Sequence, residues 1–162
     1  MLLGYLFTAC SYLLYAISRF CKRKQMILLF DLASKPFMAL SLYYFNSLSG
    51  AYIFFVICFM LIVANIKEKM HFRCLIGYLF FQTLYLIILY YTYTGYSSAL
   101  ITLCVSITLF SIWWLPPQKM RLVGGFNGLL SLTYHLSIHN WLGLFEIASI
   151  ASNFLAYHKR KK

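Results

Sequence analysis

Apolar residues along the chain gather into seven continuous blocks that are separated by short polar breaks. The blocks cover residues 2–18, 26–46, 50–66, 74–92, 97–115, 121–138 and 141–157. Each has about 17–20 residues, the length that a helix needs to cross the hydrocarbon core of a bilayer. The blocks are continuously apolar, so they do not match the alternating strands of an outer-membrane barrel. This pattern predicts an all-α integral membrane protein with seven transmembrane helices.

The breaks between the blocks are alternately basic and uncharged. The basic segments follow the odd-numbered blocks and read RFCKRK, KEKMHFR, PPQKMR and the tail HKRKK. The breaks after the even-numbered blocks, NSLSG, TYTGYSS and SIHN, carry no Lys, Arg, Asp or Glu. Short cytoplasmic loops of membrane proteins are enriched in Lys and Arg. We therefore expect the N-terminus outside and the C-terminus in the cytoplasm, which requires an odd number of spans.

Composition agrees with a membrane location. Of the 162 residues, 62% are hydrophobic and only 10% are charged, which cannot supply the polar surface of a soluble domain. The net charge of +11 comes from the basic breaks, and only Lys35 among the Lys and Arg residues lies elsewhere. The lipid bilayer is therefore the expected partner, and nucleic acid is not.

A weak internal repeat relates two parts of the chain at a shift of ninety residues. LSLYY at 40–44 resembles LSLTY at 130–134, and the same shift places Lys69 on Lys159. Together with the sidedness, the repeat predicts a first three-helix bundle at 1–70, a linker helix at 71–95, and a second three-helix bundle with the basic tail at 96–162. Both bundles would start outside and end inside, as parallel repeats about an axis along the membrane normal.

This three-plus-one-plus-three plan resembles the SWEET sugar transporters and the PnuC vitamin transporters. Two stretches, residues 23–52 and 118–159, are more similar to the bacterial YgjV-type inner-membrane proteins. The second follows that family's pattern of a basic residue, a Gly/Ser-rich helix, a Tyr near its end, a short turn and then an acid followed by Ser-Asn. The resemblance implies a bacterial cytoplasmic (inner) membrane and, by architecture alone, a transport function. Unlike SWEET helices, these spans contain only one proline, Pro36, which argues against a sugar-type pocket.

Charged residues inside one predicted span are the first candidates for a solute site. Asp31 and Lys35 are four residues apart and share a helix face, beside Pro36. Either charge alone near the bilayer centre would cost about 2.5–3.5 kcal/mol on insertion scales, so we expect the two to pair and to turn inward. Pro36 removes a backbone donor and would loosen the helix. The alternative is an intrahelical salt bridge that is only tolerated there.

The last two blocks carry further polar stripes. Asn127 and Ser131 lie on one face of the sixth block, together with either Tyr134 or His135. His135 is close enough to the outer end to face interfacial water instead. The glycines of this block are expected to allow close helix packing.

Glu146 and Asn153 lie on one face of the seventh block. Glu146 has no base four residues away, so its partner must come from another helix or its carboxyl must be neutral. The alternative is a structural hydrogen bond to a neighbouring helix.

These residues predict a small-solute transporter or facilitator whose substrate binds near the midplane between the two bundles. The expected lining residues are Asp31, Lys35, Asn127, Ser131, Glu146 and Asn153. No cofactor, metal or catalytic residue is expected, because the few acids and histidines are mostly separated in depth. Transport would alternate access by rocking one bundle against the other, with coupling to protons through Glu146 as one hypothesis.

The alternative function is a non-transporting multi-pass membrane protein, such as a scaffold, a sensor or an immunity-type subunit. A water-accessible cavity between the bundles would favour transport. A dry seam, with Asp31 closed on Lys35 and Glu146 bonded to a neighbouring backbone, would favour the alternative. The sequence leaves the substrate unnamed and leaves a homo-oligomer open.

Overall fold

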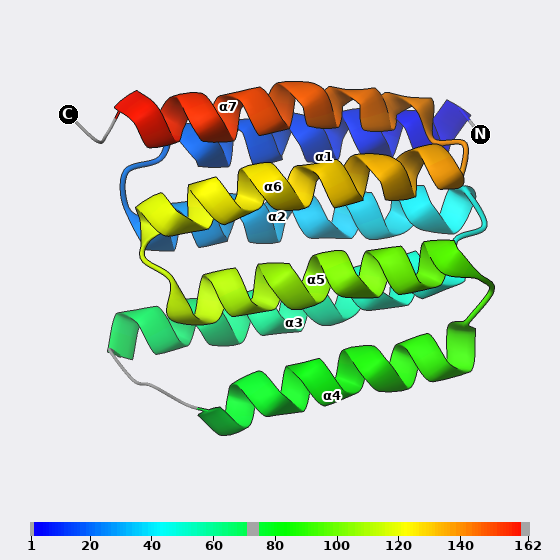
Figure 1. Ribbon diagram of the computed structural model, residues 1–162, viewed down its shortest axis with the longest axis horizontal. Helices are drawn as coiled ribbons and strands as arrows, with labels where there is room; N and C mark the ends of the chain where they lie inside the picture. Colours follow the sequence, from blue (N-terminus) through cyan, green and yellow to red (C-terminus); the bar gives the residue numbers. More distant parts are fainter. Residues whose placement is uncertain (1, 71–74, 160–162) are drawn as a thin grey trace.

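The computed structural model is entirely helical over the residues that it describes, 2–70 and 75–159 (Figure 1). Its α-helices are α1 (Leu2–Phe20), α2 (Lys24–Tyr44), α3 (Leu48–Met70), α4 (Leu75–Thr92), α5 (Tyr96–Trp114), α6 (Pro117–Ser137) and α7 (Phe145–Lys159). A short 3-10 turn, η1 (Trp141–Leu144), leads into α7. The predicted start of the linker at residue 71 and the tail at 160–162 lie outside the described residues.

Local sequence explains where several of these helices begin and end. Pro116 and Pro117 stand at the start of α6, where a missing backbone donor is harmless. Leu115 precedes them and is extended, because the residue before a proline avoids the helical region. Gly95, with φ of 137°, turns the chain between α4 and α5 in a conformation that side chains rarely adopt. By contrast, Pro36 lies inside α2, which continues as one helix through it.

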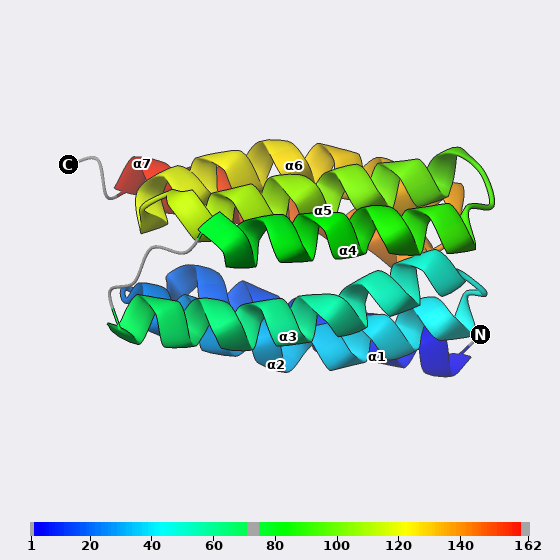
Figure 2. The same ribbon diagram turned by 90° about the horizontal axis from the view of Figure 1, so that it is seen from below.

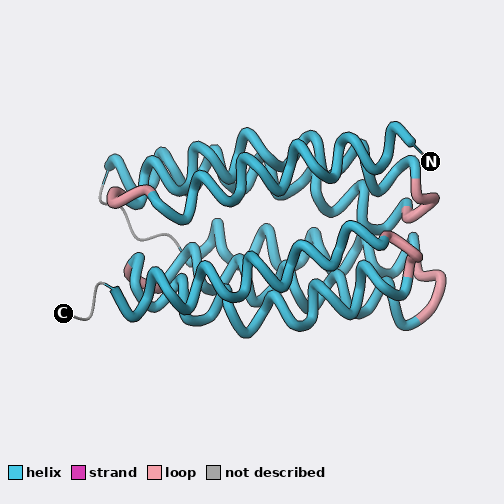
Figure 3. Tube along the Cα trace, turned by 90° about the horizontal axis from the view of Figure 1, so that it is seen from above, coloured by secondary structure: helices cyan, strands magenta, loops and turns pink. Residues whose placement is uncertain are grey.

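The helices form two layers (Figures 2 and 3). One layer contains α1, α2 and α3, and the other contains α4, α5, α6 and α7. Neighbours in sequence pack side by side within each layer. Between the layers, α1 packs on α7 and α3 packs on α5. The two middle helices, α2 and α6, lie opposite each other (Figure 1), with less close contact than the α1–α7 and α3–α5 pairs. We call the interface between the two layers the seam.

Successive helices run antiparallel, so the odd-numbered helices all point the same way (Figure 1). The breaks at 45–47, 93–95 and 138–140 therefore lie at one end of the molecule, which we call the neutral end. The breaks at 21–23 and 115–116 lie at the other, which we call the basic end. The chain enters α1 at the neutral end and leaves α7 at the basic end (Figure 3).

Four helices, α2 to α5, are long and apolar enough to cross a membrane. They agree with a membrane protein, while α6 carries more polar residues and α7 has only 15 residues. In the most apolar window of α4 only 11% is buried, against 44–50% in α2, α3 and α5. The outer surface of α4 is thus an apolar face, which suits contact with lipid.

Apolar packing holds the layers together on the α3 and α5 side. The fully buried side chains there include Ile53, Met60 and Leu61 of α3 and Leu109 of α5. They belong to a continuous core that also reaches α2 and α4. The apolar core therefore lies between α3 and α5, and the polar side chains of the other helices lie nearer the middle of the seam.

Candidate functional site

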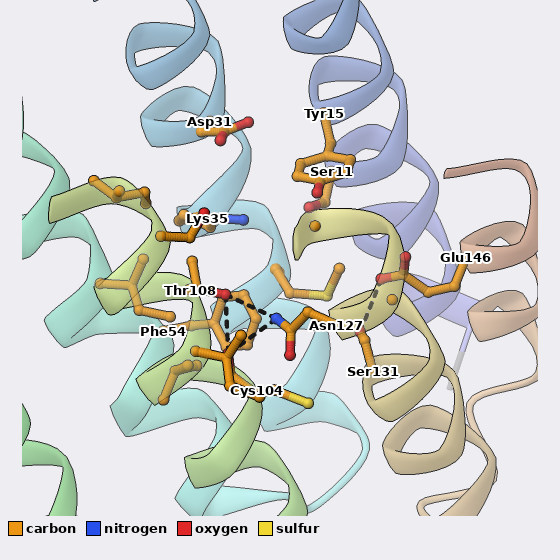
Figure 4. A pocket seen from close by; sticks show the side chains of 18 of the residues that line it. Ser11, Tyr15, Asp31, Lys35, Phe54, Cys104, Thr108, Asn127, Ser131 and Glu146 are labelled. Carbon is orange, nitrogen blue, oxygen red and sulfur yellow. Dashed lines mark hydrogen bonds between the residues drawn. The ribbon is translucent and has the colours of Figure 1, made fainter. Parts of the chain in front are cut away.

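A cavity lies between the two layers, in the middle of the seam (Figure 4). Its volume is about 110 Å³, and a buried water needs roughly 10–15 Å³. The cavity therefore has room for several waters or for one small solute. Helices α1, α2, α3, α5, α6 and α7 all contribute to its wall, and among the described residues α4 contributes none. The polar and charged wall residues are Ser11, Tyr12, Tyr15, Arg19, Asp31, Lys35, Thr108, Ser111, Asn127, Ser131, His135 and Glu146.

Asp31 is held by α1, not by Lys35. Its Oδ2 lies 3.3 Å from Nη2 of Arg19, and its Oδ1 accepts a hydrogen bond of 2.7 Å from Ser18. Both side chains of the ion pair are about 6–7% exposed. Tyr15 covers the guanidinium of Arg19 with its ring at 3.9 Å. The expected pairing of Asp31 with Lys35 is thus wrong, because the antiparallel helix α1 brings both a guanidinium and a hydroxyl donor to this carboxylate.

Lys35 consequently points into the cavity without an ion-pair partner in the part of the chain that the structure describes. No carboxylate of the described residues lies within ion-pairing distance of its Nζ. The ammonium instead lies over the rings of Tyr15 and Phe54, at 5.1 Å and 5.5 Å from their centroids. Such contacts stabilise a cation only in part. Figure 4 shows the side chain reaching from α2 toward the middle of the cavity.

The opposite wall is formed by α6 and α7. Glu146 of α7 accepts a hydrogen bond of 2.8 Å from Ser131 of α6. No cation of the described residues forms an ion pair with this carboxylate. Lys35 and Glu146 thus bring opposite charges to the cavity from different layers (Figure 4).

Asn127 is fixed between α6 and α5. Its Nδ2 donates to the carbonyl oxygen of Cys104 and to Oγ1 of Thr108, each at 3.0 Å. Its buried Oδ1 has no hydrogen-bond partner among the described residues. The amide therefore ties two helices of one layer together beside the cavity.

Two sequence candidates lie differently from what was expected. Asn153 is fully buried but does not line the cavity, and its Nδ2 donates to the carbonyl oxygen of Ser149 on its own helix. His135 does line the cavity, but it is only 1% exposed, so the expectation of interfacial water is wrong. Its Nδ1 lies 3.2 Å from the amide of Asn140. The structure thus joins Asp31, Lys35, Asn127, Ser131 and Glu146 in one cavity and leaves Asn153 outside it.

Glycines of α6 set the distance between α6 and α7. A Cβ on Gly128 would lie 2.6 Å from Cγ1 of Ile150, and one on Gly125 would lie 2.9 Å from the ring of Phe154. The packing role expected for these glycines is confirmed, since any side chain would push α7 away. Their close approach is what allows Ser131 to reach Glu146.

Sequence reasoning missed the contribution of α1. Arg19 was assigned to a basic break, although α1 continues to Phe20 and carries its side chain into the seam. Tyr15 carries no distinct signal in the sequence, because a tyrosine in an apolar block usually packs or lies at an interface. The available signal was the short break at 21–23, which forces α1 and α2 into an antiparallel pair.

Hydrogen bonds close the seam beyond the cavity at the neutral end. Ser47, in the break before α3, bonds to the hydroxyl of Tyr134 in α6 at 2.7 Å. Ser49 of α3 bonds to Ser98 of α5 at 3.2 Å. We call these two contacts the neutral-end latch. Each joins one layer to the other.

Two contacts cross the seam at the basic end. Arg121 of α6 donates to the carbonyl oxygen of Cys21 at 3.0 Å. Lys67 of α3 donates to the carbonyl oxygen of Trp113 in α5. We call these contacts the basic-end latch. Hydrogen bonds between the two layers thus lie on both sides of the cavity along the helix direction.

The cavity wall presents charged groups of both signs together with hydroxyl and amide groups. Within residues 2–70 and 75–159, no three His, Cys, Asp or Glu side chains lie together as a metal site would require.

No protein-family model matches the chain, and no curated protein or solved structure matches it either.

Proposed function

We propose that this protein carries a small polar solute across a lipid bilayer. All seven helices would span the membrane, as two trios (α1–α3 and α5–α7) joined by α4. We keep the YgjV-type resemblance, the bacterial inner membrane, and an outside N-terminus as parts of this proposal. The basic end would then face the cytoplasm.

One observation carries the proposal: a cavity with charged groups at the centre of an otherwise apolar bundle. Polar and ionisable groups within a membrane bundle are expensive, and they usually mark a substrate or ion pathway. Arg19, Asp31, Lys35 and Glu146 all line this cavity. Lys35 in particular would be better replaced by an apolar residue if the seam served packing alone.

The arrangement of the helices supports two related trios. Helix α2 begins at Lys24 and α6 at Pro117, 93 residues later, close to the shift of ninety suggested by the sequence. A half-turn about an axis along the helices would place α1 on α5, α2 on α6 and α3 on α7 (Figure 1). That relation agrees with α1 facing α7 and α3 facing α5. The outlying position of α4 suits a linker.

Alternating access would follow from rocking one trio against the other. The solute would bind between Lys35 on one trio and Glu146 on the other. Opening the basic-end latch while the neutral-end latch stays closed would expose the cavity to the cytoplasm, and the reverse would expose it outside. Protonation of Glu146 could couple this cycle to a proton gradient.

Uptake into proteoliposomes tests the proposal. Vesicles with and without the protein are exposed to a mixture of sugars, nucleosides, organic acids, amines and amino acids, and their contents are compared by mass spectrometry. We expect at least one solute to enter only with the protein. Ser11→Phe, which fills the cavity from α1, should abolish that uptake, whereas Ala16→Phe on the outer face of α1 should not. If no solute enters, the transport proposal fails.

The non-transporting alternative draws support from a different observation. Asp31 is closed on Arg19, and Glu146 is bonded to Ser131, so part of the polar seam satisfies itself. A scaffold or sensor would need no more than this. It predicts no uptake and no effect of solutes on the thermal stability of the purified protein.

A further inference from the structure

We propose that the cavity binds a small zwitterion, a solute with one carboxylate and one primary ammonium group, between Lys35 and Glu146. This inference rests on the proposed transport function and names the chemical class of its substrate. The carboxylate of the solute would face Lys35 of α2, and its ammonium would face Glu146 of α7.

Lys35 provides the half of the site that recognises a carboxylate. Its ammonium has three N–H donors, and none of them makes a hydrogen bond or ion pair to a described residue. Neutral aromatic rings flank it, and they leave its hydrogen-bonding capacity unused. A carboxylate that enters the cavity would form a charge-assisted hydrogen bond there, which is among the stronger interactions of this kind.

Glu146 provides the half that recognises an ammonium. Ser131 donates to Oε1 and so orients the carboxylate. Since no described cation pairs with Glu146, its charge is available to the solute. A primary ammonium can donate hydrogen bonds to this group, whereas a quaternary ammonium cannot.

Charge balance in the cavity favours a solute with both groups. Arg19 and Asp31 neutralise each other. Lys35 and Glu146 then contribute one charge of each sign to the same space. A lone anion or a lone cation would leave a net charge inside the bilayer, at a considerable free-energy cost. A zwitterion pairs both charges and leaves the total unchanged.

The size of the cavity limits the solute. At roughly 10–15 Å³ for each water, a volume of about 110 Å³ holds roughly 7–11 waters, which suits a small solute. Met38, Ile57 and Ile101 line it as well and give it an apolar wall. Alanine, which joins both charged groups through one carbon and carries only a methyl group, is therefore a suitable probe.

Calorimetric binding to the full chain in nanodiscs tests this assignment. We expect alanine to bind, and we expect propionate and ethylamine, each of which retains one of its charged groups, to bind at least about tenfold more weakly. Lys35→Met and Glu146→Gln should each weaken alanine binding by about tenfold or more. The matched variants Lys69→Met and Glu68→Gln, at the end of α3 and outside the cavity, should bind alanine as the parent protein does.

The comparison of alanine with propionate and ethylamine needs no variant, so a variant that misfolds does not affect it. Propionate binding as tight as alanine binding overturns the assignment, and so does undiminished alanine binding by a folded Lys35→Met protein. Uptake of another class of solute without alanine also overturns it, but leaves transport standing. Failure of all solutes to enter proteoliposomes would instead count against transport itself.

Discussion

At the scale of single residues, the most informative finding is the choice of partner for Asp31. An acid and a base one helical turn apart suggested a pair within α2. In the structure Asp31 instead forms an ion pair with Arg19 and accepts a hydrogen bond from Ser18, both on α1, and Lys35 faces the cavity. An ion pair between helices and an unpaired ammonium have different consequences, since the first is structural and the second is available to a ligand.

Asp31→Asn should destabilise the protein strongly. It leaves Arg19 buried without its counter-charge, and removing one partner of a buried ion pair costs about 3–5 kcal/mol. Thermal unfolding in detergent measures the loss. Glu68→Gln is the control, because its pair with Lys24 at 2.9 Å is partly exposed and should contribute only about 0–1 kcal/mol. Equal unfolding temperatures for the two variants would contradict the structural role of the Asp31 pair.

Glu146 supplies a test of proton coupling. If its protonation drives transport, uptake by the parent protein should depend on pH between about 5 and 8, and Glu146→Gln should remove that dependence. Transport by the variant with an unchanged pH profile would rule out this coupling. Uptake of the solute identified in proteoliposomes, measured at several pH values, provides the data.

At the scale of helices, the close contact between α6 and α7 depends on Gly125 and Gly128, which have no side chains. Gly128→Ala should push α7 outward, because the new Cβ would meet Ile150 at 2.6 Å. We expect a loss of about 1–3 kcal/mol in stability, which thermal unfolding can measure. Gly124→Ala is the matched control on the same helix, since its Cβ would lie 3.4 Å from Asn153. Ile150→Ala should cost less stability in the Gly128→Ala protein than in the parent, and equal costs in the two backgrounds would argue against this contact.

Helix positions followed from the sequence better than helix contacts did. The apolar blocks at 97–115 and 121–138 predict both limits of α5 and the end of α6 to within one residue, because this signal is local, whereas α6 begins four residues earlier than predicted, at Pro117. The partner of Asp31 and the burial of His135 could not be predicted in this way. They depend on which helix faces which, and every block is apolar enough to pack against any other. Lys35, Asn127, Ser131 and Glu146 were found because polar groups in such blocks are few.

At the scale of the whole molecule, the antiparallel course of the helices separates two chemically distinct ends. Cysteines introduced in a chain whose five native cysteines are replaced by serine can report their sidedness in cells. We expect Asn46→Cys, at the neutral end, to react with an impermeant maleimide from outside. Lys22→Cys, at the basic end, should react only after the cells are opened. Labelling of both from the same side would rule out the proposed topology.

The 3-10 turn before α7 has a consequence for the surrounding lipid. η1 leads directly into α7, and at about 2.0 Å and 1.5 Å per residue the two together extend over about 30 Å. A typical hydrocarbon core is also about 30 Å thick. With residues 141–159 in the bilayer, the membrane would need no local change of thickness beside the last helix, and lipids with much longer or much shorter acyl chains should suit the protein less well.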